Sequence, residues 1–171
     1  QIGGWTSPPS LRGRCSCRAD STRIPRYSSM NLESLSGHGG NNFKGMIRDL
    51  AFVYPDFLII AVDWFSIVPP KDYFEAVVDD HAGESETSVM MHYHPELVNL
   101  AEAGDGESKP FAIPSLNEKV GWAPRHWDKA TVDSGVGNPK NASAEKGERY
   151  MKPVVEKLSK LFTEVGQGSL Y

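Results

Sequence analysis

The sequence predicts an α/β protein because helical and strand patterns alternate along it. Apolar residues recur at helical spacing over 43–54, and a continuous apolar run, FLIIAVDWF, follows at 57–65. Such a run, with little polar alternation, is typical of a strand that is covered on both faces. Helical spacing returns after residue 86 and again after residue 143. This order favours α/β layers over an all-β fold or a helical bundle.

Residues 1–30 differ from the rest of the chain. They are rich in Ser, Arg, Gly and Pro and show no helical or strand period. One interpretation is a disordered segment, since this composition buries too little apolar surface to offset chain ordering. The other is a start that is not native coding sequence. We therefore expect an irregular segment at 1–30, an α/β domain over 31–165 and a short tail at 166–171.

The first helix is expected directly after a glycine-rich loop. Its apolar face is formed by Phe43, Met46, Ile47, Leu50, Ala51 and Tyr54. Pro55 and Asp56 end this helix, and the apolar strand follows. The stretch MNLESLS, which precedes the loop, is a weaker strand candidate because Leu32 and Leu35 are its only large apolar residues after the first position.

The second half is expected to hold two helices separated by a long irregular segment. The shorter helix ends before Pro95 and carries on one face Thr87, Met90, Met91 and His94. Residues 99–141 are mostly loop, and such a loop in a compact domain is more often a functional lid or an interface than an idle linker. Three of its side chains could close over a substrate or pack against a neighbouring subunit, namely Trp122, His126 and Trp127.

The last helix is expected to begin near Ser143, a plausible N-cap. Pro153 should kink this helix or restart it. The predicted buried stripe consists of Gly147, Tyr150, Met151, Val154, Val155, Leu158, Leu161 and Phe162.

Composition restricts the partners. A net charge of −4 argues against nucleic acid or an anionic membrane, since both reward a basic surface. No apolar run approaches the roughly 20 residues that cross a bilayer. Cys15 and Cys17 are too close for the usual zinc or redox pair, so no disulfide framework is expected. These observations predict a cytoplasmic protein with no nucleic-acid partner and no membrane partner.

Two short motifs concentrate titratable residues. SGHGGNN, at 36–42, presents His38 from a tight glycine loop before a helix, although a histidine between glycines is more often a turn residue than a ligand. DDHAGESETS, at 79–88, places His81, Glu84 and Glu86 at a bend. Imidazole and carboxylate groups suit Zn, Mn or Fe. A dinuclear hydrolytic centre also needs a bridging carboxylate, which these motifs do not supply.

The chain resembles the creatininase (creatinine amidohydrolase) family from about His38 to Phe162. The stretches GHGGNN, DWF, DHAGESETSVMM, PELV and NASAEKGERYM occur in the same order in that family. The resemblance implies a three-layer α/β/α sandwich around a largely parallel sheet, usually in a homo-oligomer. It also implies hydrolysis of a C–N amide or cyclic amide bond of a small molecule by a metal-activated water. The complete site of the family holds two divalent metal ions.

The resemblance implies different roles for the two motifs. His38 corresponds to a metal-binding histidine, and His81 to the histidine that shuttles a proton. Creatininase has a glutamate at the place of Gly40, so we expect Glu84 to reach the metal from the other loop, with Glu86 beside it.

The surroundings of the site also follow from the resemblance. Trp64 matches one aromatic residue of the creatininase pocket, whereas Val77 stands where the second would be, so a substrate other than creatinine is expected. Asn41 and Asp80 complete the expected surroundings, and Asp80 either orients His81 or is a solvated loop acid.

One feature of the family is absent from the sequence. Its first motif, E-H-G-x-H-x-P followed by an aspartate, has no match in residues 1–36. The chain is therefore interpreted as the C-terminal portion of a family member. Two alternatives to an active amidohydrolase remain open at this point. One is a catalytically impaired homologue or fragment that keeps the fold and the oligomer interface, and the other is a single-metal binding module.

Overall fold

The computed structural model describes residues 30–167. The expectations for the N-terminal segment up to residue 29 and for residues 168–171 of the tail lie outside these described residues. No helix in the described part of the chain has the length and the apolar character needed to cross a membrane.

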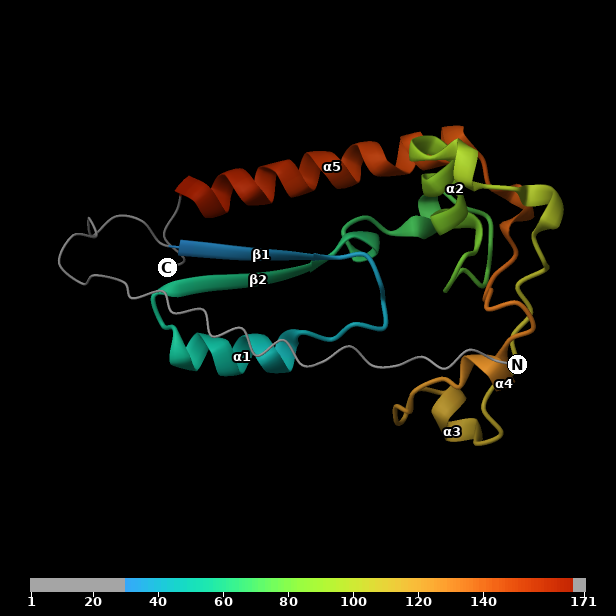
Figure 1. The fold of residues 1–171 in the computed structure, drawn as a ribbon, viewed down its shortest axis with the longest axis horizontal. Coiled ribbons are helices and arrows are strands. Elements are labelled where there is room, and N and C mark those ends of the chain that lie inside the picture. The colour runs from blue at the N-terminus through green and yellow to red at the C-terminus, as the bar shows by residue number, and fades with distance from the viewer. Residues whose placement is uncertain (1–29, 168–171) are drawn as a thin grey trace, which may run out of the picture.

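The centre of the fold is a parallel pair of strands joined by a helix. Strand β1 (Met30–Ser36) pairs with β2 (Phe57–Asp63) along their whole length, from Met30 opposite Phe57 to Ser36 opposite Asp63. Helix α1 (Lys44–Val53) makes the crossover that a parallel pair requires. In Figure 1, α1 lies on one side of the strands and α5 (Ala144–Gln167) on the other. This is the α/β arrangement that the sequence predicted, and the weakly signalled strand before the glycine loop is formed.

The other predicted helices are formed, but the predicted buried stripe of α5 (Ala144–Gln167) is only partly covered, since Val155 is 45% and Phe162 37% exposed. Helix α2 (Glu84–Tyr93) begins at the acidic bend. Ser143 caps α5, since its Oγ accepts a hydrogen bond from the Lys146 backbone N at 3.2 Å. The helix continues through Pro153 without the restart that was one of two expected outcomes, because Tyr150 and Val154 anchor it on either side. The segment between α2 and α5 is mostly irregular and holds two four-residue helices, α3 (Pro114–Asn117) and α4 (Trp127–Ala130).

The core lies where α2 and α5 meet the loop that follows β2. Its buried residues are Val68, Phe74, Tyr150 and Val154. Tyr150 is 1% exposed, and its hydroxyl lies 3.0 Å from the Val68 carbonyl oxygen and 3.3 Å from that of Phe65. Burial, together with nearby Asp79 and Tyr73, raises the pKa of Tyr150 above its ordinary value of 10.0. The core therefore fixes the loop after β2 against α5.

Gly147 permits the close crossing of α5 over α2. A Cβ at this position would lie 2.1 Å from the Ser88 carbonyl oxygen, which is a backbone atom that cannot rotate away. We expect Gly147→Ala to lower the free energy of unfolding by about 1–3 kcal/mol, because the helices must move apart. Gly45→Ala in α1 is the matched control: its Cβ meets nothing within 4 Å, so the gain in helix propensity should stabilise by about 0.5–1 kcal/mol. The free energies of unfolding can be measured by urea denaturation. If both substitutions changed this free energy in the same direction, the close packing at Gly147 would be contradicted.

None of the residues of helix α1 is buried, whereas the longer helices α2 and α5 each bury side chains. The side chains of α1 include Met46 at 54%, Phe52 at 89% and Val53 at 62% exposure. The predicted apolar face is therefore present in the sequence but largely uncovered among the described residues. The described sheet has only two strands, so it offers α1 too narrow a surface.

Candidate functional site

His81 is held through its backbone by a segment far away in the sequence. Its N donates to the Val136 carbonyl oxygen at 3.0 Å, and its own carbonyl oxygen accepts from the Val136 N at 2.8 Å. The next residue, Ala82, has a φ of 50°, a left-handed conformation that is costly for alanine. This turn leads the chain from the bridge into α2 and fixes the direction of the His81 side chain.

Glu86 stabilises this turn and faces the imidazole. Its Oε2 accepts a hydrogen bond from the Ala82 N at 2.7 Å and lies 3.6 Å from His81 Nδ1. Thr87 Oγ1 donates to the Ala82 carbonyl oxygen at 3.2 Å from the same helical turn. One carboxylate thus satisfies the backbone N–H of the strained turn and faces Nδ1 of the imidazole.

The two predicted histidines come together although they lie on different loops. The rings of His38 and His81 are 6.2 Å apart between centroids and meet edge to face. A Cβ at Gly40 would lie 2.7 Å from His38 Nε2, so the imidazole occupies space that only glycine leaves open. Asn41 closes this loop, since its N donates to the His38 carbonyl oxygen at 3.1 Å.

Asp80 pairs with an arginine rather than with His81. Arg125 Nη2 donates to Asp80 Oδ2 at 2.5 Å. The guanidinium carbon lies 4.7 Å from the centroid of the Trp127 ring, and that ring meets the His81 ring at 5.0 Å. Trp127 is a residue that the sequence predicted for this region, whereas Arg125 was not predicted because no local pattern links it to Asp80.

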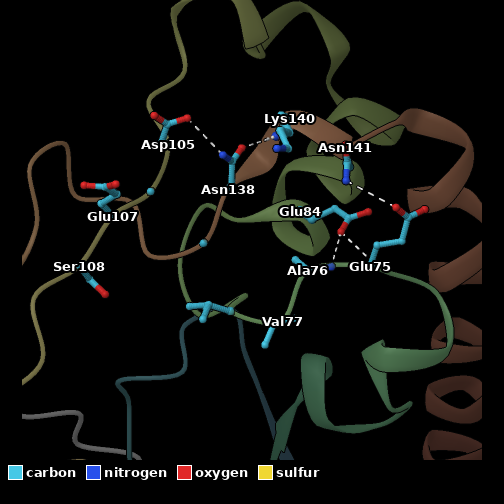
Figure 2. A pocket seen from close by; sticks show the side chains of 13 residues that line it. Glu75, Ala76, Val77, Glu84, Asp105, Glu107, Ser108, Asn138, Lys140 and Asn141 are labelled. Carbon is cyan, nitrogen blue, oxygen red and sulfur yellow. Dashed lines mark hydrogen bonds between the residues drawn. The ribbon is translucent and has the colours of Figure 1, made fainter.

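Glu84 lies apart from this group, and both of its carboxylate oxygens accept hydrogen bonds from other residues. Its Oε2 accepts from the Glu75 N at 2.9 Å and the Ala76 N at 2.8 Å (Figure 2). Its Oε1 accepts from Lys146 Nζ at 2.5 Å. Burial alone would raise the pKa of Glu84, but the hydrogen bonds from Lys146, Ala76 and Glu75 and the Lys146 charge lower it below 4.5. The hydrogen bond with Glu84 outweighs burial and raises the pKa of Lys146 above 10.5.

In this geometry Glu84 is engaged by other groups. The fully buried carboxylate already has a cation, the Lys146 ammonium, and both of its oxygens accept hydrogen bonds. These contacts anchor the 75–76 segment and α5 to the start of α2, and the expected metal-binding role of Glu84 stays a prediction. The sequence held a signal that Glu84 and Glu86 point in different directions, because residues two apart in a helix do not share a face.

A cavity of 380 Å³ adjoins Glu84 (Figure 2). Val77 and Val78 form part of its wall, and Glu75, Asp105 and Glu107 add carboxylates. Val77 is thus a lining residue of this cavity, and its expected place in a substrate pocket stays a prediction.

Trp64 lies in the edge of the core. Its ring packs against Tyr150 at 6.1 Å and Phe65 at 6.0 Å between centroids. The expected pocket role of Trp64 remains a prediction, since the structure gives it no contact with His81.

The residues described here do not fit a metal centre by themselves. Among residues 30–167, no three His, Cys, Asp or Glu side chains are grouped so as to hold an ion. His38 is one available imidazole, and Glu84 is engaged elsewhere.

The family model for creatininase, creatinine amidohydrolase, matches residues 30–162. The chain belongs to the creatininase family. A crystal structure from Bacteroides fragilis NCTC 9343, provisionally named a creatinine amidohydrolase, is 80% identical, with a TM-score of 0.81 over 83% of this chain and 56% of that chain. A mycofactocin precursor peptide peptidase of Mycobacterium ulcerans (strain Agy99) is 32% identical over 130 residues, which cover 73% of this chain and 45% of the peptidase.

Creatininase itself shares the fold at low identity. A glutamate-to-glutamine mutant of creatininase in a Zn–Zn form is 22% identical, with a TM-score of 0.57 over 80% of this chain and 57% of that chain. The three-layer creatininase fold expected from the sequence is confirmed by these structures. The chain spans about half the length of the relatives it matches, with 45% of the peptidase and 56% of the Bacteroides protein covered.

Proposed function

We propose that this chain carries the proton-transfer part of a creatininase-family amidohydrolase that cleaves a C–N amide bond in a small molecule. The observation that carries the proposal is the setting of His81. The backbone of His81 is hydrogen-bonded to Val136, and Glu86 faces one nitrogen of its imidazole. The His38 ring meets the His81 ring edge to face. Family membership over residues 30–162 favours this reading over an impaired fragment.

We assign His81 the proton transfer that amide cleavage requires. Cleavage of an amide requires a proton on the departing nitrogen, since an amide anion is a very poor leaving group. With Nδ1 directed at Glu86, Nε2 of the neutral ring can take a proton from the attacking water. The resulting imidazolium is stabilised by the Glu86 carboxylate, and it then delivers the proton to the leaving nitrogen.

Metal dependence is part of the proposal. Creatininases that share this fold include a Zn–Zn type and a manganese form. In this chain we assign His38 as the metal-binding residue, because its imidazole adjoins His81 and is not engaged by a carboxylate among the described residues. A two-metal centre needs further donors besides His38.

The homo-oligomer also stays a proposal. Trp122 is 86% exposed and Val120 77% exposed in the long segment between α2 and α5. Large apolar side chains of this kind are enriched in subunit interfaces.

A chimera tests the proposed activity. Residues 30–171 would be joined to the part of the 80% identical Bacteroides protein that this chain does not cover, since so close a relative should supply compatible surfaces. We expect the purified chimera to release amine from small amides in the presence of Zn²⁺ or Mn²⁺. Folded chimera with bound metal but no hydrolysis of linear amides, cyclic amides or formamides would contradict the proposal.

A further inference from the structure

Arg125 presents a guanidinium with most of its donors unused. Its Nη2 bonds to Asp80 Oδ2, and the guanidinium makes no other hydrogen bond within residues 30–167. An arginine side chain carries five N–H donors in a planar fork that matches a carboxylate. The remaining donors are therefore available to a ligand, and the Arg125 side chain is 33% exposed.

Trp127 connects this cation to the candidate proton carrier. The guanidinium stacks over the indole at 4.7 Å, and the indole meets the His81 ring at 5.0 Å. Stacking on an aromatic face restricts the guanidinium plane. One aromatic ring thus contacts both a fixed positive charge and the imidazole of the proposed proton carrier.

The contact with Asp80 can be exchanged at little cost. Asp80 is 55% exposed, and ion pairs between exposed side chains contribute little to stability. A ligand carboxylate can therefore replace Asp80 and form a bidentate pair with the guanidinium, which is stronger than a single contact.

We propose that Arg125 determines the specificity of the site and selects amides that carry a carboxylate within reach of its guanidinium. Trp127, which contacts both the guanidinium and the His81 ring, provides an apolar wall beside such a substrate. That such a molecule is hydrolysed rests on the proposed function. Recognition of its carboxylate by Arg125 requires no hydrolysis and can be measured separately.

Binding of two matched probes to the full chain tests the inference. The probes are 4-acetamidobutanoate and its neutral analogue 4-acetamidobutanamide, followed through the NMR signal of the Trp127 indole N–H, assigned with Trp127→Phe. We expect the acid to bind about 5- to 10-fold more tightly than the neutral amide. Arg125→Gln should abolish this preference, and Asp80→Asn should strengthen binding of the acid because it removes the competing carboxylate.

Arg149→Gln is the control variant. Arg149 also stacks on an aromatic ring, that of Tyr73 at 5.8 Å, and bonds to the Tyr73 carbonyl oxygen at 3.1 Å. The Arg149→Gln variant should keep the preference for the acid. Equal binding of the two probes, a preference that survives Arg125→Gln, or saturation without a shift at Trp127 would each overturn the inference. A binding preference in a chimera that hydrolyses nothing would contradict only the proposed function, and hydrolysis without preference would contradict only the role of Arg125.

Discussion

Replacing Glu84 with glutamine is expected to lower the free energy of unfolding by about 2–4 kcal/mol. The fully buried carboxylate accepts from two backbone amides and neutralises Lys146, whose Nζ is otherwise left with Glu75 Oε1 at 3.4 Å and the Asn141 carbonyl oxygen at 3.0 Å. Glutamine keeps an oxygen acceptor but removes the charge. The loss should appear in urea denaturation at neutral pH.

The control for this change lies in the same helix as Lys146. Glu164 pairs with Lys160 at 3.6 Å, with side chains that are 62% and 76% exposed. Glu164→Gln should therefore change stability by less than about 0.5 kcal/mol. If the two substitutions had equal effects, or if Glu84→Gln emptied the chimera of metal, the structural role of Glu84 would be wrong.

The pH dependence follows from the same pair. Because the pKa of Glu84 is lowered on folding, its stabilisation is present above about pH 4.5 and is lost as the pH falls through the folded-state value. Because the pKa of Lys146 is raised, its contribution is present below about pH 10.5 and is lost as the pH rises through the folded-state value. Glu84→Gln should therefore weaken the dependence of stability on pH at the acid end.

Replacing His81 with alanine is expected to slow amide hydrolysis by the chimera about 10²- to 10⁴-fold. The variant lacks the group that carries a proton to the leaving nitrogen, while Glu86 still caps the turn through the Ala82 N. His94→Ala is the control, since His94 is an exposed histidine 3.3 Å from Glu96 at the end of α2. A chimera whose turnover survives His81→Ala would remove His81 from the mechanism.

The elements could be predicted from sequence where local patterns decide them. The proline after α1, the apolar run of β2 and the Ser143 cap are local signals, and each gave an element in its expected place. The Glu86 contact was also readable, since a glutamate at the third helical position often reaches back to a backbone N–H before the helix.

Long-range charge partners could not be predicted in this way. Lys146 reaches Glu84 and Arg125 reaches Asp80 only because the chain between them folds back, and no spacing rule records that. The exposure of α1 has a similar cause. Its apolar stripe predicts burial, but the surface that would cover it is not supplied by a sheet of two strands.

The central claim is that two adjacent imidazoles have different tasks, with metal binding at His38 and proton transfer at His81. Metal content and amide turnover measured in the same preparations of the chimera test it most directly. We predict that His38→Ala loses metal and activity together, whereas His81→Ala keeps the metal and loses turnover. Full metal content in His38→Ala, or loss of metal in His81→Ala, would contradict the account.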